Sequence, residues 1–405
     1  MKVLLVSGHA KDWHAGASTV YLHLHQALEQ AGQPCDLYHR EDYVPARTPG
    51  AVLKFTQAGA LRRRLERAAR AADVIEVAGN LGGPLFAALR RLRPQQRPLL
   101  VTRLHGLEFL DEQARVTEEI AGHVKLPLKY RLLTRHVTNR QEFRTLALCD
   151  RVICYTSRDV DALITAGLKP ETHISQMPPG VEPRFLDAFA ERVHAPARRR
   201  LLWWGSWVER KGIATLPRAF ALACRATADL TLTIGGTGAP AAVVLEQFAP
   251  EVRARVTVLP FLTPDQHLAT LREHDIFLFP SLSEGFGLAL LEAMATGLPC
   301  ITTLTGMAYD HLEHGRDAIL VPMNAPTALA RAITALCPDS ERRRALGEGA
   351  HRTALTLTWP ALAHRTLDVY RESLALLRRR EADPSATSSP LSGSGAMPST
   401  AERRS

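Results

Sequence analysis

Short apolar runs alternate with amphipathic stretches from one end of the chain to the other. The runs are rich in Val, Ile and Leu at consecutive positions, which is typical of strands buried on both faces. One amphipathic stretch is Ser18–Gln30, where Ser18 is suited to cap a helix and Gly32 to end it. In the first half we expect strands at Val3–Ser7, Cys35–His39, Val74–Val77, Leu99–Leu104 and Arg151–Tyr155, with helices such as Ala60–Ala72 and Pro84–Leu92 between them. Strands that alternate with helices predict a parallel, doubly wound sheet.

A proline-rich segment, Met177–Pro183, divides the chain into two parts. Its prolines and glycine cannot continue a helix or a central strand, so we expect a hinge here. The alternation then resumes, with strands expected at Leu201–Trp204, Leu230–Ile234, Arg255–Leu259, Ile276–Phe279, Pro299–Thr302 and Ala318–Val321. The predicted fold class is α/β, with two Rossmann-like doubly wound domains that face each other across a cleft, where a ligand is expected to bind.

We place the first domain at residues 1–182 and the second at residues 183–360. The amphipathic stretch Ala361–Arg379 follows a proline suited to a helix start, and it is predicted to cross back onto the first domain as a helix over about 361–380. The segment 381–405 is rich in Ser, Pro, Ala and charged residues without periodicity, and we expect it to be disordered.

The composition is that of a soluble globular protein: of 405 residues, 46% are hydrophobic and 22% are charged. No apolar run approaches the roughly 18 residues of a membrane span, and Met1–Ser7 is too short for a signal peptide, so a cytoplasmic location is expected. The six cysteines form no CxxC pair, and they fit reduced thiols better than disulfides or a zinc site.

The net charge of +9 is concentrated in residues 1–185, which hold 26 Lys and Arg against 19 Asp and Glu. A basic half attracts phosphates or an anionic membrane surface. The basic, amphipathic stretch Lys125–Arg144 could rest on such a membrane, or it could pack on the sheet with a solvated basic face, and the second interpretation is favoured. The chain has no aromatic-interleaved RNA motif, so no nucleic-acid partner is expected.

The segment Ser283–Gly287, followed by Glu292, carries the strongest chemical signal. It connects the expected strand Ile276–Phe279 to a helix expected over Leu288–Thr296. The unpaired amides and the dipole of a helix make its start an anion site, and glycines let a ligand approach the backbone closely. The pattern therefore predicts a diphosphate site.

Two carboxylates, Glu284 and Glu292, flank this site. Eight residues correspond to about 12 Å along a helix, which is too far for a paired acid and base acting on one bond. We expect each carboxylate to accept hydrogen bonds from a separate pair of hydroxyls, one on a sugar ring and one on a ribose. For either glutamate alone, a solvated surface acid would be the better interpretation.

These residues resemble glycosyltransferase family 4, whose members have the GT-B architecture. The E-x7-E signature of the family is matched by Glu284 and Glu292, with the usual Pro280-Ser281 and Ala293–Pro299 flanks. The resemblance implies that Glu292 binds the donor ribose and that Glu284 holds hydroxyls of the transferred sugar. The donor-binding residues that it implies in this segment are Glu284, Gly285, Phe286, Gly287 and Glu292.

The upstream segment Gly205–Gly212 looks like the phosphate loop of the family. Lys211 matches the lysine that neutralises the leaving group, which is chemically sensible because departure leaves negative charge on two phosphates. The family usually has arginine where this chain has Ser206, and whether the nearby Arg210 takes its place is open from the sequence. The donor-binding residues implied in this region are Gly205, Arg210 and Lys211, together with Gly236 in a turn near the phosphates.

His105 ends an expected strand of the first domain, at the edge where ligands enter open α/β sheets. It resembles the family histidine that faces the donor sugar, and with Glu284 and Lys211 it completes the expected catalytic set. A purely structural role is the alternative for His105. Gly16 and Ser18 resemble a reduced form of the glycine-rich first loop of the family, which would touch donor or acceptor.

The resemblance implies a hexosyltransferase that retains the anomeric configuration and needs no metal or other cofactor. Its donor would be a nucleotide sugar, UDP- or GDP-linked, and its acceptor a glycan, a lipid-linked molecule or a small molecule in glycan or polysaccharide biosynthesis. A lipid-linked acceptor would bring the protein to the inner face of the cell membrane. Two alternatives stay open: a non-catalytic nucleotide-sugar-binding protein, and a GT-B-like epimerase, which would need titratable groups poised near the sugar.

Overall fold

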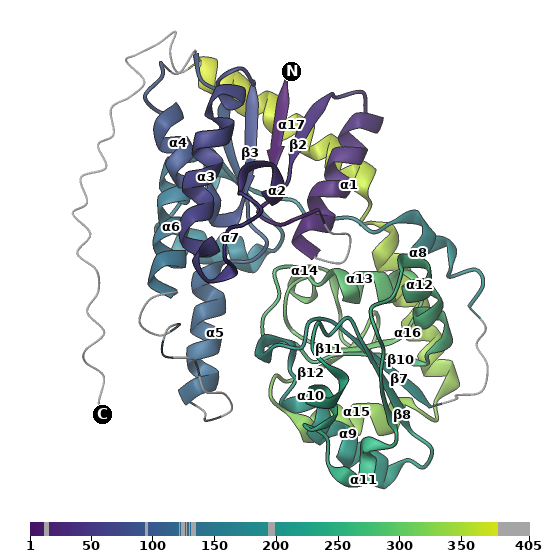
Figure 1. The fold of residues 1–405 in the computed structure, drawn as a ribbon. Coiled ribbons are helices and arrows are strands. Elements are labelled where there is room, and N and C mark those ends of the chain that lie inside the picture. The colour runs from purple at the N-terminus through teal and green to yellow at the C-terminus, as the bar shows by residue number, and fades with distance from the viewer. Residues whose placement is uncertain are drawn as a thin grey trace.

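The computed structural model describes residues 1–11, 16–93, 96–120, 122, 126, 128, 130, 135–192 and 199–379. These residues form two α/β units, each built on one six-stranded sheet whose neighbouring strands are all parallel (Figure 1). The two-domain α/β architecture predicted from the sequence is confirmed. In the part of the chain that the structure describes, no helix is long and apolar enough to span a membrane.

The first sheet has the strand order β2-β1-β3-β4-β5-β6. Its strands are β1 (Val3–Val6), β2 (Cys35–Tyr38), β3 (Val74–Ala78), β4 (Leu99–Arg103), β5 (Arg151–Cys154) and β6 (Ile174–Gln176). Its helices are α1 (Gly16–Gln30), α2 (Arg40–Tyr43), α3 (Gly50–Arg70), α4 (Gly83–Leu89), α5 (Glu108–Ile120), α6 (Arg135–Leu148) and α7 (Ser157–Thr165). Val3 and Leu5 of β1 enter one core, and Leu4 and Val6 enter another, which explains the continuous apolar run.

The second sheet has the strand order β12-β11-β10-β7-β8-β9. Its strands are β7 (Arg200–Trp204), β8 (Thr231–Gly235), β9 (Val256–Val258), β10 (Ile276–Phe279), β11 (Cys300–Thr303) and β12 (Ile319–Val321). Its helices are α8 (Pro183–Asp187), α9 (Thr215–Ala226), α10 (Ala241–Leu245), α11 (Pro250–Arg253), α12 (Pro264–Glu273), α13 (Leu288–Ala295), α14 (Ala308–His311), α15 (Pro326–Leu336) and α16 (Ser340–Leu355). The strand order reverses between the neighbouring strands β7 and β10, which creates a topological switch point.

The chain crosses between the two units twice, and the crossings lie side by side. Val181 on the outward crossing pairs with Thr358 on the return in an isolated parallel bridge. Gly180 approaches the return so closely that a Cβ there would lie 2.2 Å from the amide nitrogen of Trp359. The chain then continues into α17 (Trp359–Arg379), which packs on α1 and β4 of the first unit (Figure 1).

Several element boundaries differ from the sequence prediction. Ser18 does not stand at the start of its helix, because α1 begins earlier, at Gly16, and the Ser18 hydroxyl donates to the carbonyl oxygen of Ala10 at 2.9 Å. Helix α3 begins at Gly50, well before the expected start at Ala60. Strand β6 was not predicted, because it has only three residues and all are half-buried.

Two predictions fall wholly or partly on residues outside those that the structure describes. The segment 381–405, expected to be disordered, lies outside them. Most of the first half of the basic stretch 125–144 lies outside them too, and its residues 135–144 belong to α6.

Candidate active site

The loops that follow β7 and β10, Gly205–Gly212 and Pro280–Gly287, meet at the switch point of the second sheet. The amide of Leu282 in the second loop donates to the carbonyl oxygen of Arg210 in the first at 2.7 Å. Gly212 has φ +75°, and a Cβ there would lie 2.0 Å from a carbonyl oxygen of the second loop. Only glycine fits such a position. Ligands of open α/β sheets bind outside the strand ends at a switch point.

The Glu284 side chain is held at the centre of this loop pair and is 5% exposed. The Lys211 Nζ lies 2.6 Å from one carboxylate oxygen, and the Arg210 Nη1 lies 3.4 Å from the other. The Ser281 hydroxyl donates to the first oxygen at 2.7 Å. Burial alone would raise the pKa of Glu284, but Lys211 and Arg210 hold it below its usual value. Glu284 is therefore charged at neutral pH.

Lys211 and Arg210 both belong to the short 3₁₀ turn Glu209–Lys211 and direct their charges to the same carboxylate. The Lys211 ammonium also lies 4.9 Å from the centroid of the Phe279 ring. Ser206, which stands where the family has arginine, is exposed on the loop. The geometry therefore gives the site a second cation, Arg210, from a position four residues further along the chain.

Helix α13 begins directly after the second loop, and Gly287 stands before it with φ +101°. The Phe286 side chain is buried and packs edge-on against Tyr155 of the first domain, with ring centroids 6.1 Å apart. Gly306, which the sequence did not single out, packs directly against this loop. A Cβ added to Gly306 would lie 2.3 Å from the Phe286 carbonyl oxygen, so the close approach requires glycine. The amides of the first turn of α13 and the two cations lie at the same strand ends, a suitable arrangement for a diphosphate.

Glu292 lies further along α13, away from Glu284. Its carboxylate is 3.9 Å from the Nδ1 of His267 on α12. It also lines a small cavity, with room for about one water, together with His23 and Glu182 at the domain junction. Burial, with a contribution from Glu182, raises the pKa of Glu292 to about 8, against the opposing effect of Arg184.

Trp204 and His267 form an aromatic pair beside Glu292 that the sequence reasoning missed. Their rings are stacked, with centroids 4.1 Å apart and planes 24° apart. Trp204 also packs on the two glycines at the end of β8. A Cβ added to Gly235 would lie 2.1 Å from the Trp204 indole, and a Cβ added to Gly236 would lie 2.8 Å from it. The structure thus places Gly236 against an indole. A tryptophan at the end of a strand is usually a core residue, so the sequence offered no signal for this pair.

His105 reaches the site from the first domain. A Cβ on Gly285 would lie 1.9 Å from the His105 carbonyl oxygen, so the backbones of the two domains touch here. The His105 Nδ1 lies 2.9 Å from the Tyr155 hydroxyl, and its buried Nε2 has no hydrogen-bond partner among the described residues. Burial, followed by His9 and Arg103, lowers the pKa of His105 to about 3. The ring is therefore neutral and has a nitrogen available for a ligand.

Gly16 and Ser18, the residues of the expected first loop, lie near the start of α1. Gly16 faces the second domain: a Cβ added to it would lie 3.7 Å from the Leu288 side chain at the start of α13. The Ser18 hydroxyl bonds within the first domain, to Ala10. Gly16 is thus placed next to the helix that follows the Glu284 loop.

Two doubly wound domains that meet at the ends of their strands define the GT-B class of architecture. The fold is similar to the sucrose-phosphate synthase of Thermosynechococcus elongatus, with 21% identity and a TM-score of 0.74 over 93% of this chain and all of that chain. It is also similar to Anabaena HepE, solved in complex with UDP and glucose, with 15% identity and a TM-score of 0.63 over 92% of this chain and all of that chain.

Sequence comparison gives the family. A model of glycosyltransferase family 4 matches residues 14–185, and a model of glycosyl transferases group 1 matches residues 198–339. A D-inositol 3-phosphate glycosyltransferase from Salinispora tropica is 31% identical over 264 residues, which is 60% of this chain and 55% of the relative. The chain spans about half the length of the curated relatives it matches. The protein belongs to the family 4, group 1 glycosyltransferases.

Proposed function

We propose that this protein transfers a hexosyl residue from a nucleoside diphosphate sugar to an acceptor hydroxyl, with retention of the anomeric configuration and without a metal ion. The observation that carries the proposal is the convergence of Lys211 and Arg210 on Glu284 beside the start of α13. Two cations and a helix N-terminus suit a diphosphate, and the adjacent carboxylate suits the hydroxyls of the attached sugar.

In the proposed reaction, the bond between the anomeric carbon and the diphosphate oxygen breaks while the acceptor hydroxyl attacks from the same face. Lys211, Arg210 and the α13 amides stabilise the charge that develops on the departing diphosphate. The proton of the acceptor passes to an oxygen of that diphosphate, so the transfer needs no protein base. Because side chains and amides supply the positive charge, we propose that turnover needs no divalent cation.

His105 fits a positioning role toward the donor sugar. Its pKa is lowered to about 3, so the ring is neutral over the whole pH range in which the protein would work. Its buried Nε2 can exchange a hydrogen bond with a sugar hydroxyl, while Tyr155 fixes the ring through Nδ1. A neutral histidine of this kind orients the sugar without adding charge to it.

We further propose that Glu292 holds the donor ribose and that Trp204 and His267 form the wall beside it. The donors to test are UDP- and GDP-sugars. The acceptors to test are glycans, lipid-linked molecules and D-inositol 3-phosphate, the compound in the names of the curated relatives. We propose a cytoplasmic location, at the inner face of the membrane if the acceptor is lipid-linked.

The experiment measures transfer with each donor by product analysis, including the anomeric configuration of the product. Lys211→Ala should lower turnover by at least about 100-fold, since it removes positive charge from the leaving-group site. Glu284→Gln should lower it by at least about 100-fold as well, since it removes the carboxylate that is proposed to hold the sugar hydroxyls and that positions Lys211 and Arg210. Glu209→Gln is the matched control, because Glu209 is an exposed acid of the same loop and should leave turnover unchanged. Thermal melting of every variant separates loss of turnover from loss of fold.

Each alternative has a distinct outcome. Wild-type turnover in both variants would reject the assigned site, and an inverted product, or loss of turnover with a chelator, would reject the mechanism. Donor binding without any transfer would indicate a nucleotide-sugar-binding protein. Conversion of the donor sugar without an acceptor would indicate an epimerase.

A further inference from the structure

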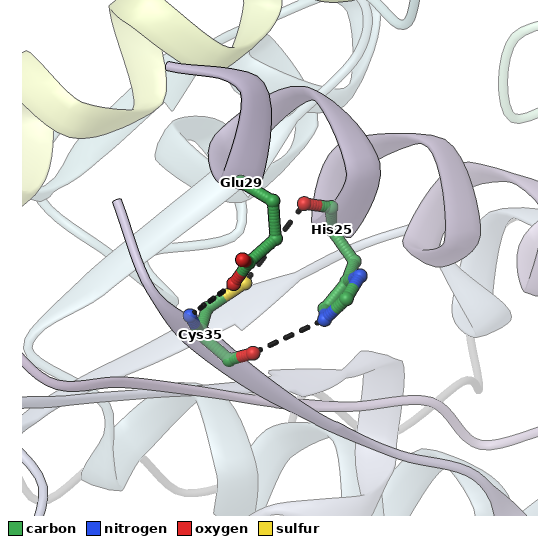
Figure 2. A group of neighbouring side chains, drawn as sticks. All are labelled: His25, Glu29 and Cys35. Atoms are coloured by element: carbon green, nitrogen blue, oxygen red, sulfur yellow. Dashed lines mark hydrogen bonds between the residues drawn. The ribbon is translucent and has the colours of Figure 1, made fainter. Parts of the chain in front are cut away.

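A cluster of three side chains with nitrogen, oxygen and sulfur ligand atoms lies outside the proposed active site. His25 and Glu29 are one helical turn apart on α1, and Cys35 is the first residue of β2. One ligand atom from each residue can be chosen so that all three atoms lie within 4.8 Å of one another. Figure 2 shows the carboxylate, the thiol and the imidazole gathered between the end of α1 and the start of β2.

Backbone contacts hold this cluster in place. The Glu29 Oε1 accepts a hydrogen bond from the Cys35 amide at 2.8 Å, and the His25 Nε2 lies 3.1 Å from the Cys35 carbonyl oxygen. The helix and the strand are joined by only four residues, Ala31–Pro34, so the segment is local in the sequence. Glu29 is exposed and the other two residues are half-buried, which leaves the cluster open to an ion from solution.

We propose that His25, Glu29 and Cys35 bind a zinc ion, with water as the fourth ligand. Zinc takes imidazole, carboxylate and thiolate together in tetrahedral sites at about 2.0–2.3 Å, so the ligand atoms must move inward by about 1 Å from their present separation. A thiolate disfavours magnesium and calcium, which prefer oxygen ligands. On binding, the zinc–sulfur bond forms as the Cys35 thiol proton leaves to solvent.

The position of the site indicates what the ion does. Cys35 lies on β2, the edge strand of the first sheet. His25 lies about 14 Å along α1 from Gly16, the end of the helix that is near α13. The ion would join the end of α1 to that edge strand and stabilise the folded first domain by mass action. It therefore lies apart from the transfer step proposed for the other end of the helix.

The test uses the full chain without a histidine tag, stripped of metal and titrated with zinc chloride and, separately, cobalt chloride. We expect one zinc equivalent, a zinc-dependent rise in Tm, and the near-ultraviolet charge-transfer absorption of a cobalt–thiolate bond. Cys35→Ser and His25→Gln should weaken zinc binding at least tenfold, and Cys35→Ser should abolish the cobalt–thiolate absorption. Cys224→Ser is the matched control, because Cys224 is another half-buried thiol on a helix of the second domain.

Two outcomes would overturn the proposal. One is the absence of any zinc equivalent in the wild-type chain. The other is equal zinc affinity in the wild-type chain and in both ligand variants, provided that the metal-free variants melt as the metal-free wild type does. If a metal-free variant has a lower Tm than the metal-free wild type, Glu29→Gln is measured in its place. Glu29 is exposed and contributes least to packing among the three residues.

Discussion

The Glu284 side chain is buried and that of Glu292 is half-buried, and their surroundings move their pKa values in opposite directions. Burial opposes charge at each of them. At Glu284 the neighbouring Lys211 and Arg210 outweigh burial, so the carboxylate stays charged. At Glu292 the charge of Glu182 adds to the effect of burial, and the pKa rises to about 8. Near pH 7, without ligand, the first is therefore an anion and the second carries a proton.

Glu292→Gln should stabilise the protein more at high pH than at low pH. The pKa of Glu292 is raised to about 8 in the folded chain, so folding retains a proton that the unfolded chain releases above about pH 4.5. The stabilisation that comes from keeping this proton is fully present below about pH 4.5, and it is lost as the pH rises toward 8. Glutamine stays neutral, so the Tm gain over wild type should grow by at least about 3 °C between about pH 5 and about pH 9.

The titratable or charged groups around Glu292 are Glu182, Arg184 and His267, with His23 lining the same cavity. The control for the pH series is Glu251→Gln, an exposed acid of α11, which should give a Tm difference that does not depend on pH. A pH-independent difference for Glu292→Gln as well would contradict the raised pKa.

At the scale of the element, α17 is attached to the first sheet through a buried ion pair. The side chains of Glu76 on β3 and Arg103 on β4 are fully buried, and the Arg103 Nε lies 2.7 Å from the Glu76 Oε1. On α17, the Tyr370 hydroxyl donates to the Glu76 carboxylate at 2.6 Å, and the Thr366 hydroxyl accepts from Arg103 at 3.3 Å. The helix therefore supplies hydrogen bonds to charges that would otherwise lack solvation, in addition to its apolar face.

Arg103→Leu should destabilise the protein by about 3–5 kcal/mol, because it leaves the Glu76 charge buried without its partner. Glu76→Leu combined with Arg103→Leu should cost less than Arg103→Leu alone, since the double variant buries no charge. Urea unfolding monitored by circular dichroism measures both. A double variant no more stable than Arg103→Leu would show that the strands depend on the pair itself.

The sequence predicted most of these elements but little of how they contact one another. Apolar runs predicted β1, β3, β4 and β10 within a residue or two, because strands buried on both faces have a distinctive composition. The Glu76–Arg103 pair was not predicted, since a single charge in an apolar strand does not reveal its partner. Likewise, Lys211 and Glu284 are 73 residues apart in the sequence and come together because β7 and β10 are neighbouring strands. The spacing of the two residues along the chain does not predict that pairing of strands.

At the scale of the whole molecule, the two domains are in contact across the proposed site. The Asp310 carboxylate of the second domain accepts hydrogen bonds from the Ser157 amide at 2.9 Å and the Gln176 side chain at 3.0 Å, both in the first domain. The Ser283 hydroxyl donates to Asp111. With the approach of Gly285 to the His105 carbonyl, these contacts define a closed arrangement.

Gly285→Ala should hold the domains apart. In the closed arrangement its Cβ would lie 1.9 Å from the His105 carbonyl oxygen, a distance that no real contact tolerates. Small-angle X-ray scattering should give a larger radius of gyration than wild type, with an unchanged Tm of the second domain. Gly59→Ala, at a half-buried position of α3 where only Arg63 would lie near the added Cβ, at 3.6 Å, should scatter as wild type does. Identical scattering from Gly285→Ala and wild type would contradict the closed contact.

The position of α17 also governs the order in which the protein can be made. Residues 359–379 leave the ribosome after the entire second domain, yet they form hydrogen bonds with Glu76 and Arg103 in the first. Until then the nascent first domain lacks α17, so the charged pair and the apolar residues that α17 covers are exposed. About 180 further residues are synthesised in the meantime, a delay of roughly 10–40 s at usual translation rates. The first domain is begun first and completed last, so a chaperone that shields it during synthesis should raise the yield of folded protein.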